Sequence, residues 1–224
     1  MHELQVFETH FRPVELHERI CCDGHISEFN TGNVIRDVPK RFRASDDPEC
    51  ILGLAAEGIF LKKLVLVFSS SKADVEKIAL QLAKILDEIY RSNSVIAARI
   101  NRSALQGVLS NIQRAAGTVD PVLLKTLPRG VAFHHAGLTS EERECIEQGF
   151  RDGVIMVLVA TNVTYIRCLC KKVVSERDLN LGVNLPASRV VIKAQVRGPA
   201  AITATTYKQM SGRAGRLGQV EIGK

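Results

Sequence analysis

Four short apolar runs, separated by amphipathic stretches, dominate the middle and later parts of the chain. Each run is too short for a typical helix and is apolar at most positions, which is typical of strands buried on both faces of a parallel sheet. We therefore predict strands at residues 64–68, 131–138 (a strand with its exit loop), 154–160 and 189–192.

The stretches around these runs predict helices. Apolar residues at helical spacing mark one helix that opens at Asp47-Pro48, with the proline in its first turn. The serines at 69–71 can cap the next helix. Two shorter helices are predicted at residues 104–114 and 121–126, and residues 139–142 resemble the acidic first turn of a further one.

The N-terminal part carries weaker patterns. Residues 11–26 alternate loosely between apolar and polar, and Pro13 favours extended geometry for its neighbour, so we predict a strand or hairpin arm. Residues 30–47 are polar and irregular, so we predict a surface connection there.

The order of these elements predicts a doubly wound α/β fold, with a mainly parallel sheet and helices on both of its faces. In such folds, ligands bind beyond the carboxyl ends of the strands. The polar loops at residues 69–72 and 134–138, the segment from Thr161 onward and the segment 209–216 would all lie at that edge. The sequence therefore indicates a ligand site there.

Composition and charge favour a polyanionic partner without requiring one. The 224 residues carry a formal net charge of +6 and a pI near 9.1, a modest excess that many proteins with no nucleic-acid role share. No apolar run approaches membrane-spanning length, so we expect no membrane association. The six cysteines form no C-x-x-C framework, so we expect reduced thiols in an intracellular protein and no metal site.

The most distinctive polar stretch covers residues 207–218. It places Arg213 and Arg216 three positions apart, so on a helix or tight turn both guanidinium groups emerge from the same side. Gly212 and Gly215 precede them and let another molecule approach the backbone closely. Paired guanidinium groups suit the charge that develops on a transferred γ-phosphoryl group. A basic, glycine-rich surface turn that touches solvent or a nucleic-acid backbone is the alternative.

Four motifs, in the right order, resemble those of superfamily 2 DExH-box helicases. They are residues 11–14 (FRPV), 130–139 (GVAFHHAGLT), 182–187 (GVNLPA) and 207–216 (YKQMSGRAGR). The resemblance extends over nearly the whole chain, from about residue 11 to residue 218. Such helicases are built from two RecA-like domains that clamp ATP between them, and residues 11–224 resemble the second.

The resemblance implies a role for several residues near the nucleotide. Arg213 and Arg216 would contact the γ-phosphate of ATP, and Gln209 would help to position it. Gly182 and Asn184 match the motif that approaches the nucleotide and couples it to DNA. An ordinary proline-capped loop turn is the alternative for that last motif.

The resemblance also implies contacts with the DNA backbone from the loops at the strand ends. The implied residues are Ser69, Ser70, Lys72, His134, His135, Gly137, Leu138 and Thr161. Hydroxyls and backbone amides bind phosphates without reading base sequence. Because His134 and His135 are consecutive on an extended stretch, they point to opposite sides and cannot both face one ligand. Either histidine can instead be structural.

The glycine loop that cradles phosphates and the acidic motif that holds magnesium in this class do not occur in these residues. We therefore expect ATP with Mg²⁺ to be held mainly by the first RecA-like domain of the same parent protein. The isolated chain would then hydrolyse no ATP. The resemblance implies a nuclear motor for double-strand break repair that acts on single-stranded or branched DNA.

One stretch departs from the family pattern. The strand that ends near Thr161 normally runs within a few residues into the motif at 182–187, but here the 15 residues 164–178 intervene. Closure entropy grows slowly with loop length, so the fold can accommodate this insertion loop. The coupling of ATP hydrolysis to DNA is more sensitive to the insertion, because the two halves of the coupling motif must still meet across it. The alternative hypothesis is a non-enzymatic nucleic-acid-binding module derived from such a helicase. We further expect residues 1–10 to be a tail and the domain to be truncated at its last strand.

Overall fold

A four-stranded parallel sheet forms the centre of the chain. The computed structural model describes residues 15–43, 47, 49–161, 187–193, 203, 206–207 and 222–223. The strands are β5 (Val65–Ser69), β6 (Val131–His134), β7 (Val157–Thr161) and β8 (Arg189–Ile192), in the spatial order β6-β7-β5-β8. Every residue of β5, β6 and β7 is buried, which explains why their sequences read as continuous apolar runs.

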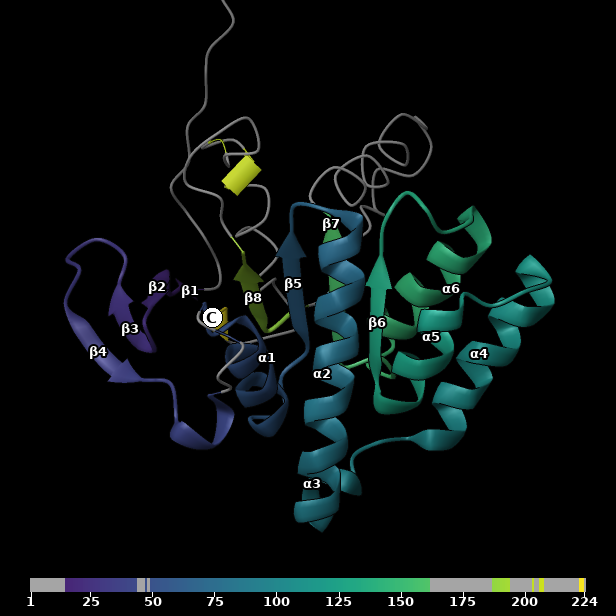
Figure 1. Cartoon of the computed structure of the whole chain (residues 1–224), viewed down its shortest axis with the longest axis horizontal. Coiled ribbons are helices and arrows are strands. Elements are labelled where there is room, and N and C mark those ends of the chain that lie inside the picture. Colours follow the sequence, from purple (N-terminus) through teal and green to yellow (C-terminus); the bar gives the residue numbers. More distant parts are fainter. Residues whose placement is uncertain are drawn as a thin grey trace, which may run out of the picture.

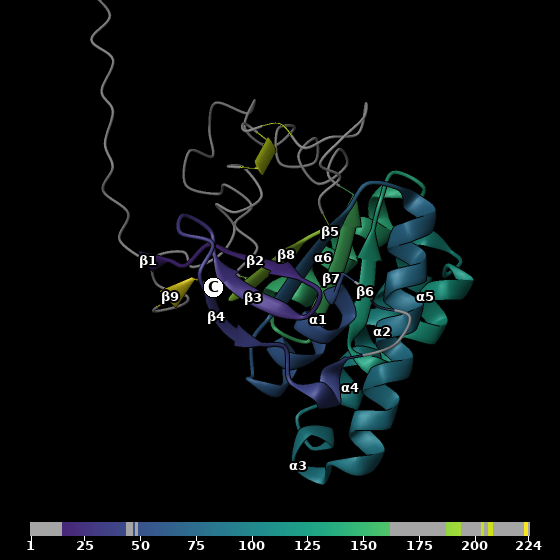
Figure 2. The ribbon, with the colours of Figure 1, turned by 60° about the vertical axis from the view of Figure 1, so that its left-hand side comes forward.

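Helices cover both faces of this sheet (Figures 1 and 2). α1 (Ile51–Phe60) packs on β5 and β8, and α2 (Lys72–Ser92) lies beside α1 on β6 and β7. On the other face, α6 (Ser140–Arg151) packs against β6, and α4 (Arg102–Ala116) packs along α6. The predicted doubly wound α/β architecture is therefore confirmed, and it is that of a RecA-like domain.

Short elements complete this layer. α3 (Ser94–Ala97) follows α2 directly, and α5 (Pro121–Thr126) continues into the 3-10 turn η2 (Leu127–Arg129). The bounds of α5 are those predicted from the sequence, because Asp120 caps its first turn and Pro121 fits the first helical position.

The apolar side chains of the sheet and helices meet in one large core. α2 contributes a stripe at helical spacing: Val75, Ile78, Ala79, Leu82 and Leu86 are buried, and Ile85 is partly buried against the same core. Phe68, Phe133 and Phe150 are each at most 1% exposed. Full burial of each large apolar side chain stabilises the fold by about 1.5–3 kcal/mol.

A second, smaller sheet lies beside β8 and α1 (Figure 2). Its strands β2 (Arg19–Cys22), β3 (His25–Glu28) and β4 (Val34–Asp37) are antiparallel. β1 (Glu15–Leu16) pairs separately, in parallel, with β9 (Ile222–Gly223). The extended geometry predicted for residues 11–26 is confirmed from residue 15 onward, apart from turns.

The surface connection predicted for residues 30–47 is wrong in part. This stretch contains β4 and the 3-10 turn η1 (Lys40–Phe42). Val38 and Phe42 are buried against the α1 region. β4 escaped the sequence analysis because it is defined by hydrogen bonds to β3, while its own apolar residues face outward and show no buried alternation.

Two further boundaries differ from the prediction. α1 begins at Ile51, not at Pro48. Asp47 lies four residues before this start, and its carboxylate accepts a hydrogen bond at 2.9 Å from the backbone N–H of Gly53 in the first turn. β7 begins at Val157 rather than at residue 154, because the N–H groups of Val154 and Ile155 both bond to the carbonyl of Gly149 in the turn that ends α6.

Candidate nucleic-acid interface

The described DNA-facing candidates gather at the carboxyl edge of the parallel sheet. Ser69 ends β5 and lies in register with Thr161, which ends β7. His134 ends β6 and pairs with the residue before Thr161. The parallel register therefore brings together side chains that are up to 92 positions apart in the sequence (161 − 69).

The N-terminus of α2 opens directly at this edge. Ser71 caps the helix by accepting a hydrogen bond from the N–H of Asp74, so the predicted serine cap is confirmed. Ser70, Ser71 and Lys72 are exposed. Free backbone N–H groups and the helix dipole make such a terminus favourable for an anion.

The loop between β6 and α6 lies next to this helix terminus. A Cβ atom placed on Gly137 would lie 3.5 Å from Nζ of Lys72, so this loop and the first residue of α2 meet at the surface. Gly137 is exposed, and its N–H donates to Nδ1 of His135 at 3.1 Å. Beyond the loop, Thr139 and Glu142 form a reciprocal capping box at the start of α6.

Both histidines of the loop are buried and bonded to acidic residues on different helices. Nε2 of His134 lies 2.8 Å from a carboxylate oxygen of Glu147 on α6. Nε2 of His135 lies 2.8 Å from a carboxylate oxygen of Glu76 on α2. They thus point to opposite faces of the sheet, as their adjacent positions require. Their side chains join the sheet to its helices rather than line the surface.

A polar network beneath the edge includes Lys193, which the sequence analysis missed. The Ser69 hydroxyl is buried and donates to the carboxylate of Asp74. Nζ of Lys193 lies 3.1 Å from Oδ1 of the same carboxylate and 3.7 Å from Oε2 of Glu49. Lys193 immediately follows β8. Its position directly after a predicted strand is the sequence feature that could have placed it at this edge.

The network fixes the charge of its members. Burial alone would raise the pKa of Asp74, but the hydrogen bonds from Ser69 and Lys193 bring it below its usual value. Burial alone would lower the pKa of Lys193, but its bond to Asp74 raises that pKa above its usual value. Both groups are therefore charged at neutral pH and hold the ends of β5 and β8 to the first turn of α2.

The candidates on the nucleotide side lie outside the described residues. They are Gly182, Asn184, Gln209, Arg213 and Arg216, together with the insertion loop 164–178. Within the described ranges, no group of three or more His, Cys, Asp or Glu residues is placed to hold a metal ion. No helix among the described residues is both long and apolar enough to cross a membrane.

The comparison with protein families matches half of the chain, residues 107–218, to the family described as "Helicase conserved C-terminal domain". The chain belongs to this helicase family. The superfamily 2 assignment drawn from the four motifs is therefore confirmed, and the chain contains the C-terminal domain of such a helicase.

Curated relatives of this helicase domain extend the match to almost the entire chain. DNA polymerase theta of Caenorhabditis elegans is 40% identical over 222 residues, which is 98% of this chain and 12% of the relative. Helicase POLQ-like of Drosophila melanogaster is 36% identical over 98% of this chain and 20% of the relative. The ATP-dependent DNA helicase Hel308 of Pyrobaculum calidifontis is 30% identical over 96% of this chain and 27% of the relative. The chain thus spans between about a tenth and a quarter of the length of these proteins.

Proposed function

We propose that this chain is the C-terminal half of an ATP-dependent DNA helicase or translocase motor that acts in double-strand break repair in the nucleus. The observation that carries the proposal is the edge of the RecA-like sheet, where the exposed N-terminus of α2 meets the loop at Gly137. Two relatives, a DNA polymerase theta and an ATP-dependent DNA helicase, support the choice of DNA and of an ATP-dependent motor.

On the DNA side, the surface groups make the contacts. Ser70 and Lys72 donate to backbone phosphates, together with backbone amides around Gly137, because these groups are exposed at one edge. The buried candidates lie below the surface and do not contact DNA themselves. Ser69, His134, His135, Leu138 and Thr161 fix the positions of these loops, since each is at most 6% exposed.

On the nucleotide side, the chain completes a site that another domain begins. ATP with Mg²⁺ is held mainly by the first RecA-like domain of the same parent protein, and the isolated chain hydrolyses none. Arg213 and Arg216 stabilise the charge on the γ-phosphoryl group and Gln209 positions it. Gly182 and Asn184 approach the nucleotide and couple it to DNA.

The test joins this chain to its first RecA-like domain and measures ATP hydrolysis with and without single-stranded DNA. We expect DNA-stimulated hydrolysis that falls by on the order of a thousandfold in Arg213→Ala, the scale of an arginine-finger loss. Arg114→Ala is the matched control, because Arg114 is exposed on α4 and, among the described residues, its side chain bonds only to Asn111. Unchanged turnover in Arg213→Ala would refute the assigned role.

A non-enzymatic DNA-binding module is the competing function, favoured by the 15 residues 164–178 that interrupt the coupling motif. It predicts salt-sensitive DNA binding with no hydrolysis by the joined protein. Deleting residues 164–178 separates the two functions further. A gain of hydrolysis on deletion would show that the insertion had inactivated the motor.

A further inference from the structure

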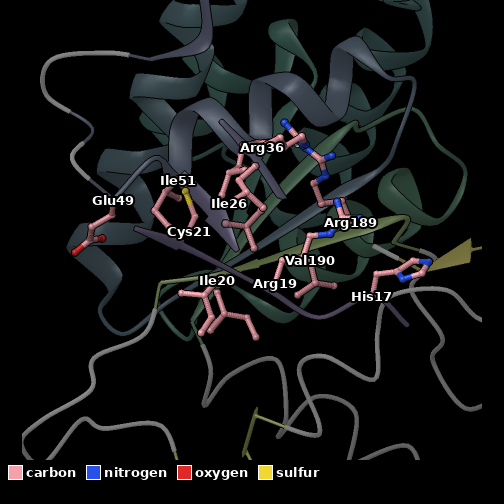
Figure 3. A pocket seen from close by; sticks show the side chains of 13 residues that line it. His17, Arg19, Ile20, Cys21, Ile26, Arg36, Glu49, Ile51, Arg189 and Val190 are labelled. Atoms are coloured by element: carbon pink, nitrogen blue, oxygen red, sulfur yellow. Dashed lines mark hydrogen bonds between the residues drawn. The ribbon is translucent and has the colours of Figure 1, made fainter. Parts of the chain in front are cut away.

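A cavity of about 170 Å³ lies on the side of the molecule where the small antiparallel sheet meets β8 and α1. Figure 3 shows its lining, with apolar side chains such as Ile26 and Ile51 among polar ones. Three arginines from different elements share it: Arg19 from β2, Arg36 from β4 and Arg189 from β8. None of them belongs to the interface described above.

The arginines outnumber the acidic groups that face them. Glu57 on α1 accepts hydrogen bonds from both nitrogens of the Arg36 fork, at 2.8 and 2.9 Å, and from Nη1 of Arg189 at 2.8 Å. The three arginines and Glu57 therefore sum to a net charge of +2 (3 − 1). Glu49 also lines the cavity, and its partner Lys193 lies closer to Asp74, at 3.0 Å, than to Glu49, at 3.7 Å, so with Glu49 included the net charge is +1.

Arg189 has donors to spare. Its side chain is only 9% exposed, and its hydrogen bonds to Glu57 and to the Leu54 carbonyl, the latter at 2.9 Å, both use Nη1. Nε and Nη2 make no hydrogen bond among the described residues and lie on a side chain that lines the cavity. Neither nitrogen is among the buried side-chain atoms of the described residues that lack a partner, so both remain accessible to a ligand or to water in the cavity.

Arg19 adds an exposed guanidinium on the same side of the cavity. Its guanidinium forms no hydrogen bond or ion pair within the described part of the chain. Burial is the main cause that lowers the pKa of Arg189, and the charges of Arg36 and then Arg19 add to it. In Figure 3 the nitrogen atoms of Arg36, Arg189 and Arg19 follow one another along one side, whereas Glu49 lies at the far side.

We propose that this cavity binds a phosphate group, with Arg19 and Arg189 donating to its oxygens and Arg36, held by Glu57, completing the positive wall. Planar guanidinium forks match the oxygens of a phosphate. A water molecule takes about 30 Å³ in the liquid, so the cavity holds a phosphate and part of the group attached to it. The phosphate is either a small one, such as inorganic phosphate, or one of the backbone of a nucleic-acid strand.

The first arm of the test measures binding of inorganic phosphate by the whole chain, by calorimetry and by thermal unfolding, against chloride and acetate at equal ionic strength. We expect phosphate alone to raise the unfolding temperature, since a ligand that binds the native state stabilises it. Arg19→Gln should weaken phosphate binding on the order of tenfold, equivalent to about 1.4 kcal/mol. Arg19→Lys should recover part of the loss, because it keeps the charge without the fork.

Arg114→Gln is the matched control, because it removes one exposed positive charge far from the cavity, on α4. Arg19 is exposed, so the Arg19→Gln chain is expected to fold, and this keeps the test independent of the buried Arg189. Phosphate no more effective than acetate would overturn the proposal, as would equal responses of Arg19→Gln and Arg114→Gln.

The second arm identifies the source of the phosphate with a fluorescent single-stranded oligonucleotide. If the site takes a backbone phosphate, Arg19→Gln lowers the salt dependence of DNA binding by about 0.7 in the logarithmic slope and Arg114→Gln does not. If the site takes a small phosphate, both variants bind the oligonucleotide alike while only Arg19→Gln loses inorganic phosphate. Neither arm requires ATP hydrolysis, so both can be interpreted even if the proposed motor function is wrong.

Discussion

Arg189 on β8 and Glu57 on α1 form an ion pair, with 2.8 Å between Nη1 and Oε2, although 132 residues separate them in the sequence. Both side chains are less than a tenth exposed. The pair fixes the outer strand of the sheet to the helix that covers it, and Arg36 brings the small sheet to the same carboxylate. One acidic side chain thus holds three elements together.

Replacing Glu57 with glutamine should therefore destabilise the chain. The change keeps the shape of the side chain but leaves two arginines without their counter-charge, and losing one partner of a buried ion pair costs about 3–5 kcal/mol. Glu49→Gln is the control, because that carboxylate is 56% exposed and its pair with Lys193 spans 3.7 Å. We expect a cost below about 1 kcal/mol for the control in urea unfolding. Equal costs would contradict the role of Glu57.

The same pair predicts a pH dependence. Burial alone would raise the pKa of Glu57, but the hydrogen bonds from Arg36 and Arg189 lower it below 4.5. A carboxyl whose pKa is lower in the folded state stabilises that state above its unfolded pKa, and the contribution is lost as pH falls through the folded pKa. The difference in unfolding free energy between wild type and Glu57→Gln should therefore shrink as pH drops below about 4.5. If this difference in unfolding free energy stayed constant well below pH 4.5, the predicted pH dependence of Glu57 would be wrong.

Two helical glycines should respond in opposite directions to alanine. A Cβ on Gly58 of α1 would lie 2.5 Å from Cγ2 of Val65, a buried residue of β5, so Gly58→Ala should cost about 1–3 kcal/mol through overpacking. Gly107 on α4 has nothing within 4 Å of the same position. Gly107→Ala should stabilise by about 0.5–1 kcal/mol, because alanine is the better helix former. Urea unfolding of both variants measures the two changes in unfolding free energy, which should have opposite signs.

Lys72→Ala tests the proposed DNA edge. Removing one phosphate contact should weaken binding of single-stranded DNA and reduce the logarithmic salt slope by about 0.7. Lys84→Ala is the matched control, since Lys84 is exposed on the same helix but about 18 Å further along it. Anisotropy titrations at several salt concentrations measure both. Equal slopes for the two variants would remove Lys72 from the interface.

The neighbouring Cys21 and Cys22 should differ in reactivity. Burial, together with the nearby Cys50, raises the pKa of the Cys21 thiol to about 11, whereas Cys22 is exposed. Since the thiolate is the reactive form, iodoacetamide should modify Cys22 first near neutral pH, and the Cys21 rate should keep rising toward pH 11. Peptide mass mapping gives the two rates. In denaturant the two modification rates should converge. A difference that persists there would show that neighbouring residues in the sequence, and not burial, set the reactivity.

The elements that the sequence predicted well are those specified by local contacts. Thr139 and Glu142 cap α6 through groups three residues apart, and Asp120 with Pro121 sets the start of α5. β4 was missed because its partner is β3 and its outward apolar residues carry no buried pattern. The helix predicted from Pro48 starts later because the Asp47 side chain reaches Gly53.

Sequence by itself determined the fold class and the family, because buried strands, capped helices and four ordered motifs are written in short stretches of the chain. Tertiary structure decided which polar residues reach the surface. Ser69 and His134 stand at strand ends but are buried against Asp74 and Glu147, and that depends on which helix packs over each strand. It also decided that arginines 170 positions apart, at 19 and 189, share one cavity, since only the packing of two sheets brings them together.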